Sequence, residues 1–167
     1  MARLRLPRVS LPWVVAGLGV AVALVFAVLW WGERSEDARR EEASATARAF
    51  LTALTNFEAG TIDQDVAEIR SYAVGAFARE VEETFSAERV EAIRANQATS
   101  VGRVRTVVVH RLGEDTASAF GVVDETVTNS ASTEPRTDVL RVELGLIETS
   151  EAWKVDRVEI LQSPSAG

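Results

Sequence analysis

Few side chains in this sequence could carry out chemistry, and they lack the companions that catalysis requires. His110 is the only histidine, and the chain contains no cysteine. A pair of histidine ligands for a metal ion, a thiolate nucleophile and a disulfide are therefore excluded. The sequence also contains neither a Gly-rich phosphate loop nor a Gly-x-Ser-x-Gly nucleophile elbow. Because His110 alternates with Val108 and Leu112 in a predicted strand, we expect it to be structural.

An isomerase site is the one enzyme arrangement that the remaining residues could form. Such a site needs an Asp base and an oxyanion hole, for example from a Tyr, in an apolar cavity. Tyr72 is the only tyrosine, and Asp124 shares the parity of Phe120 and Val122, so it could face the concave side of a sheet. Glu125 points to the opposite face and cannot act with Asp124 as a pair. We expect no enzyme, and we predict no catalytic, cofactor-binding or metal-binding residue.

Three arginines form a candidate surface of another kind. Arg103, Arg105 and Arg111 share one face of the predicted strand. That stripe either contacts a partner or is a solvated face that discourages association between sheets.

The elements that would position these residues follow a long apolar segment. The window from Val9 to Gly32 carries no charge, and a bilayer core of about 30 Å needs roughly 20 apolar residues. Trp13 lies near one end and Trp30 and Trp31 at the other, where indole rings favour the headgroup boundary. We therefore predict a transmembrane helix over residues 11–32.

The charges on either side of this segment predict its orientation. Arg3, Arg5 and Arg8 precede it without an acidic residue, whereas both signs are mixed after it. The positive-inside rule then places the N-terminus in the cytoplasm and the rest outside, as a single-pass plasma-membrane protein. A cleaved signal peptide is the alternative, but the apolar run is longer than a usual signal and no Ala-x-Ala-like site follows it.

Composition predicts one acidic domain after the segment. The net charge is −7, and because residues 1–32 carry three arginines and no acid, the remainder carries −10. This charge argues against nucleic acid as a partner. We predict a cytoplasmic tail (1–10), the membrane helix (11–32), a helical stalk (33–46), an extracytoplasmic domain (47–161) and a disordered tail (162–167).

Helical spacing dominates the first half of that domain and a period of two dominates the second. Apolar residues predict one helix from Glu33 to Phe57 and two further helical regions before Ser100. Four strands follow, at 100–112, 116–128, 136–149 and 152–161. We expect one face of each strand to carry these residues: Val104, Thr106, Val108, His110 and Leu112; Phe120, Val122 and Thr126; Leu140, Val142, Leu144 and Leu146; Trp153, Val155 and Leu161.

This order of elements predicts an α+β fold. Helices would pack on one side of a curved, four-stranded antiparallel sheet, with consecutive strands as neighbours. With its N-terminal anchor, the chain resembles the membrane-anchored NTF2-like cone that VirB8-type proteins share.

Short segments are more closely similar to the Mce-associated membrane proteins of actinobacteria. Those segments are Ala47–Leu54, Ala73–Phe77, Val122–Asp124, Val127–Asn129 and Trp153–Val155. The resemblance implies a non-catalytic accessory protein that supports an Mce-type transporter of lipids or sterols. It implies the bilayer and Mce subunits, or other membrane proteins, as partners, and it allows a homo-oligomer.

Two other functions fit the same shape. A VirB8-like protein could be a scaffold of a secretion or conjugation channel. An NTF2-like cone could instead bind an apolar ligand between its helices and its sheet. Packing of Phe50, Phe77, Phe85 and Trp153 into that space would argue against the ligand.

Overall fold

The computed structural model describes residues 35–161. The chain divides into two compact units, Met1–Arg39 and Arg40–Gly167. Only residues 35–39 of the first unit are described, and they belong to a helix that spans residues 35–55. The following elements are β1 (Phe57–Glu58), α2 (Ile62–Tyr72), α3 (Gly75–Thr84), α4 (Ala87–Ala95), β2 (Thr99–Leu112), β3 (Thr116–Asn129), β4 (Ser132–Glu148) and β5 (Trp153–Leu161).

The predicted transmembrane helix, cytoplasmic tail and C-terminal tail lie outside the described residues. Among the helices of residues 35–161, none is long and apolar enough to cross a bilayer. The membrane segment therefore stays a prediction from the sequence.

The predicted α+β class is confirmed, but the sheet has five strands and not four. The strands are antiparallel and follow the order β1-β2-β3-β4-β5. The additional strand β1 contains only Phe57 and Glu58, which pair with Ser100 and Thr99. Two residues directly after a helix are too few to show an alternating pattern, so the sequence carried no signal for this strand.

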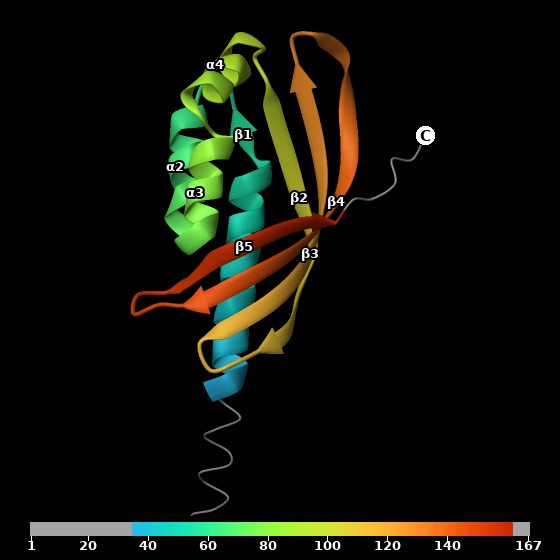
Figure 1. Ribbon diagram of the computed structural model, residues 1–167. Coiled ribbons are helices and arrows are strands. Elements are labelled where there is room, and N and C mark those ends of the chain that lie inside the picture. The colour runs from blue at the N-terminus through green and yellow to red at the C-terminus, as the bar shows by residue number, and fades with distance from the viewer. Residues whose placement is uncertain (1–34, 162–167) are drawn as a thin grey trace, which may run out of the picture. The chain divides into compact units, whose positions relative to one another are not determined.

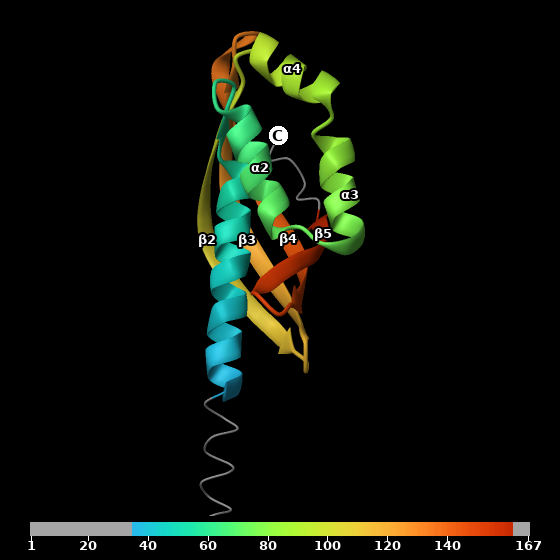
Figure 2. The ribbon, with the colours of Figure 1, turned by 90° about the vertical axis from the view of Figure 1, so that its left-hand side faces the viewer.

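All helices lie on one face of the curled sheet, which we call the inner face (Figure 1, Figure 2). In the part of the chain that the structure describes, no helix covers the opposite, outer face. The main core fills the space between the helices and the inner face. Its buried members are Ala43, Ala47, Phe50, Leu51, Ala53, Ile69, Phe77, Val81, Val109, Ala117, Ala119, Val123, Val142, Leu144, Leu146, Trp153 and Val155.

The helix of residues 35–55 approaches strand β2 closely at Gly102. A Cβ atom at this position would lie 1.8 Å from Oγ1 and 2.4 Å from Cβ of Thr55, whose side chain is buried. The side chain of Asn56 also bonds the Gly102 backbone twice, donating to its carbonyl at 3.1 Å and accepting from its N–H at 3.2 Å. Glycine therefore allows the helix to bond directly to the strand.

Side chains of the same helix reach the free edge of β2. Arg40 donates to the Val109 carbonyl at 3.0 Å, and Arg48 donates to the Val104 carbonyl at 3.4 Å. Asn56, which directly follows the helix, provides a third donor at the Gly102 carbonyl. The edge of β2 is thus capped by side chains where β1 no longer pairs with it.

The close contact at Gly102 predicts a position-specific loss of stability. Substitution Gly102→Ala should lower the free energy of unfolding by about 1–3 kcal/mol, because the new methyl group overlaps a buried side chain. At Gly60 a Cβ atom would meet nothing within 4 Å, so Gly60→Ala should change stability by less than about 1 kcal/mol. Urea denaturation of the full chain in detergent micelles measures both. Equal losses would contradict this packing.

Candidate functional site on the outer face of the sheet

Three irregularities in the sheet decide which side chains reach the outer face. The pairing of β2 with β3 shifts between Val104 and Thr106, and again between Val109 and Arg111. A third shift lies between Gly145 and Leu146 of β4. Gly145 pairs with Arg157 of β5, whereas Leu146 pairs with Val155. Each shift leaves one extra residue in a strand, as a β-bulge does, and so exchanges the faces of the residues that follow. The extra residues are Arg105, His110 and Asp156.

These bulges overturn the predicted faces of two strands. In β2, Val104, Val107, Val109 and Leu112 pack on the core, whereas Val108 is 52% exposed. In β5, Val158 packs with Trp153 and Val155, although the alternation places it on the opposite face. The alternation of β4 is undisturbed where it was predicted: Val142, Leu144 and Leu146 are all buried, and Leu140 packs against them.

His110 lies at the second bulge of β2, beside Glu143 of β4. Its Nε2 atom is 2.7 Å from Oε1 of Glu143, and its side chain is 42% exposed. Among residues 35–161, no group of three or more His, Cys, Asp or Glu side chains is arranged to hold a metal ion.

The residues of the considered isomerase site are kept apart. Tyr72 packs against the main core on the inner face, with its ring centroid 6.2 Å from that of Phe50. Asp124 lies on the outer face, where Arg105 Nε donates to its Oδ2 at 2.5 Å, so an orientation toward the concave side is wrong. Glu125 points inward and accepts from the Ser100 hydroxyl at 2.8 Å, which confirms that the two acids face opposite ways.

The space that an apolar ligand would need is filled by aromatic side chains. Phe50 is fully buried, and its ring lies edge-on to Phe77 at 5.6 Å between centroids. Trp153 is buried in the same cluster, and Phe85 packs against it. This is the arrangement that argues against a ligand-binding cone.

The outer face of β2 and β3 is the strongest candidate for a functional surface. Val101 and Val108 are 58% and 52% exposed there. Val108 stands opposite Phe120, and Val122 follows on the same face. Around this apolar strip lie the three arginines that the sequence singled out, Arg103, Arg105 and Arg111.

The electrostatics of this surface are basic at the β2 side. Strand β2 contains these three arginines and no acidic residue. Arg105 is engaged by Asp124, the carboxylate beside it on β3. An apolar centre bordered by arginine is a composition enriched in protein interfaces.

Comparisons with known proteins support the fold and go no further. No protein-family model matches the chain, and no curated protein sequence matches it. An IcmL-like type IV secretion system protein from Legionella pneumophila matches at a TM-score of 0.60 and 14% identity, over 77% of this chain and 97% of its own. The VirB8 protein of Agrobacterium tumefaciens matches at 0.58 and 6% identity, over 74% and 92%.

The same fold also occurs in a protein of another description. A proposed aromatic ring hydroxylase from Novosphingobium aromaticivorans matches at a TM-score of 0.53 and 16% identity, over 75% of this chain and 91% of its own. At these identities the matches establish a VirB8-like and NTF2-like architecture for the chain. They do not carry over an activity, because one fold serves several functions.

The sequence missed the valines at the centre of this surface. It identified the arginines. The bulges, however, place Val108 on the outer face and Val107 and Val109 on the inner face. A weak signal was present: a regular strand would have placed Val107 and Val109 on the face of Arg103, Arg105 and Arg111. When valines and arginines fall on the same expected face of one strand, the pairing register of that strand is irregular.

Adjacent valines test the bulged register directly. Val109 is 8% exposed, so Val109→Thr buries a hydroxyl and should lower the free energy of unfolding by about 1–3 kcal/mol. Substitution Val108→Thr affects an exposed side chain and should change the free energy of unfolding by less than about 0.5 kcal/mol. Denaturation of both variants in parallel gives the comparison. A larger loss at Val108 would indicate an unbulged strand and would remove Val108 from the surface.

Proposed function

We propose that this chain is a non-catalytic scaffold of a membrane-embedded protein complex, with a VirB8-like domain that docks to other components. The observation that carries the proposal is the coincidence of a filled interior with an uncovered, apolar and basic outer face. A domain whose interior is packed with Phe50, Phe77 and Trp153 has its surface available for function. The fold is the one seen in structures described as type IV secretion components.

We further propose that the domain is held outside the plasma membrane by a single span with a cytoplasmic N-terminus. This part rests on the sequence: an uncharged apolar window bordered by Trp13, Trp30 and Trp31, with three arginines before it. A fixed anchor suits a docking domain, because it raises the local concentration of the domain beside other membrane proteins.

A secretion or conjugation channel is the favoured host complex. Structures described as type IV secretion components share most of their length with this fold. An Mce-type lipid transporter is the narrower role that the sequence resemblance implies. It rests on short segments such as Ala47–Leu54, and the host therefore has to be identified by experiment.

Co-purification from native membranes identifies the host. The full chain, tagged and extracted in mild detergent, should recover components of an envelope-spanning channel in mass spectrometry. A matched chain without residues 40–161 should not recover them. Recovery of Mce subunits would favour the transporter, and recovery of no membrane partner would contradict the scaffold.

A scaffold also predicts tolerance of substitutions that would inactivate an enzyme. Tyr72→Phe, Asp124→Asn and His110→Gln each remove a group that could transfer a proton, while they keep the size of the side chain. Each variant should restore the phenotype of a deletion strain to the level of the unchanged chain, at equal protein abundance. Loss of function in any of them by about a hundredfold or more would indicate catalysis.

A further inference from the structure

Opposite charges lie on opposite sides of this domain. Helices α2, α3 and α4 carry eight acidic and four basic side chains, a net charge of −4. Strand β2 carries three arginines and no acid. The arginines of β2 lie on the outer face, as the register of β2 against β3 shows. Figure 2 shows helix α3 and strand β2 on opposite sides of the domain.

The basic side has the properties of an interface that lacks its partner. Among residues 35–161, four large apolar residues are exposed, and two of them, Val101 and Val108, lie on the outer face of β2. They are neighbours of Arg103 and Arg111 along the strand. Apolar surface that is bordered by charged residues in this way marks protein contacts more often than it marks solvated surface.

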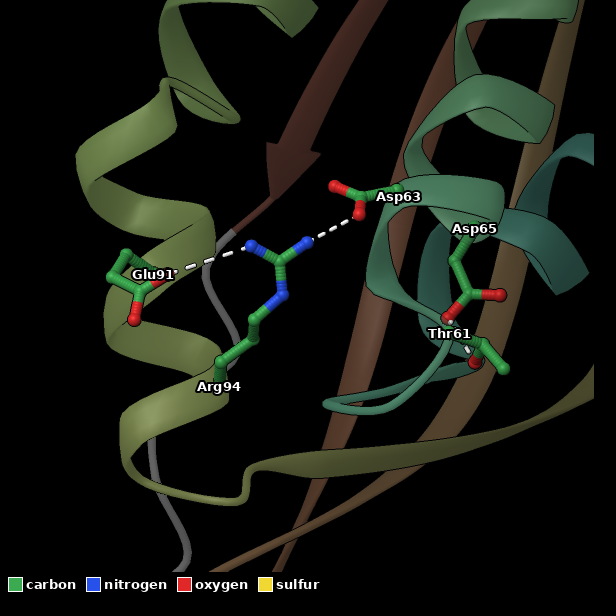
Figure 3. Close-up of polar contacts among 5 residues, drawn as sticks. All are labelled: Thr61, Asp63, Asp65, Glu91 and Arg94. Atoms are coloured by element: carbon green, nitrogen blue, oxygen red, sulfur yellow. Dashed lines mark hydrogen bonds and ion pairs between the residues drawn. The ribbon is translucent and has the colours of Figure 1, made fainter.

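On the acidic side, some carboxylates bond to other residues of the domain and others face outward. In Figure 3, Arg94 of α4 lies between Asp63 of α2 and Glu91, and Asp65 accepts from the Thr61 hydroxyl at 2.9 Å. Of these contacts, the Arg94–Asp63 pair links α4 to α2. Helix α3 presents a second set of exposed carboxylates, which are Glu80, Glu82 and Glu83.

We propose that copies of this chain associate back to front, with helix α3 of one copy on the outer face of β2 of the next. The carboxylates of α3 would meet Arg103 and Arg111, and the helix would cover Val101 and Val108. Such a contact is heterologous, and it closes into a ring when the rotation between copies permits. Rotation about an axis normal to the membrane would keep all copies in the same orientation, as the proposed membrane anchor requires. Only this last step rests on the proposed function.

Cysteine cross-linking tests the contact in the intact chain. The sequence has no cysteine, so engineered thiols report only their own positions. Full-length chains with Val108→Cys and with Glu83→Cys are mixed in one membrane and oxidised. The mixed disulfide should exceed either homotypic product by at least about tenfold. A predominant link between two Val108→Cys chains would indicate a face-to-face dimer and would overturn the proposal.

Charge reversal gives the matched control. Arg103→Glu with Arg111→Glu, or Glu80→Arg in the partner copy, should each lower the mixed cross-link by at least about tenfold, because Glu80 lies three residues before Glu83 and so on the same side of α3. Both reversals combined across the contact should restore it, because opposite charges meet again. Circular dichroism checks that each variant is folded.

The back-to-front contact would be overturned if neither charge reversal lowered the mixed cross-link. It would also be overturned if the combined reversals did not restore the cross-link. The host complex is tested by co-purification and not by cross-linking, so failure here would leave the scaffold role standing. Conversely, a self-associating chain that recovers no membrane partner would confirm the contact and contradict the scaffold.

Discussion

The free edge of strand β2 is the constraint on which the rest of the domain depends. Strand β1 pairs only with Thr99 and Ser100, so within the described part of the chain the remainder of β2 has no strand on that side. An open edge of this length would invite pairing with another chain. Here the helix of residues 35–55 occupies the position, and Arg40, Arg48 and Asn56 donate to carbonyls of β2. Tight packing of this helix is possible because position 102 is glycine.

The bulges belong to the same arrangement. The carbonyls that Arg40 and Arg48 reach belong to Val109 and Val104, and each of these residues directly precedes a bulged position. A bulge bends its strand and redirects the groups beside it. The local geometry that presents a carbonyl to the helix also turns Val108 outward. Edge protection on one side of the strand and an apolar strip on its outer face therefore share a cause.

Sequence periodicity predicted the parts of the fold in which each residue continues the pattern of its neighbours. The apolar face of helix 35–55 and the buried face of β4 follow it, as Phe50 and Leu144 show. It failed for β1, which is too short to have a period, and after Arg105, His110 and Asp156, where one extra residue reverses the parity. A bulge is stabilised by contacts distant in sequence, here with a helix about 60 residues earlier, so the local pattern carries at most a weak signal of it.

The interior of this domain is filled by aromatic side chains. A cone that performs chemistry must keep a cavity with polar groups directed into it. The walls of that cavity stay unburied, so they contribute no burial free energy to the stability of the fold. In this chain Phe50, Phe77 and Trp153 occupy the space, which stabilises the helical layer on the sheet. A rigid core of this kind fixes the shape of the outer face. Preorganisation of a surface lowers the entropic cost of docking, so under the proposed scaffold role the packed interior would assist contacts on the outer face.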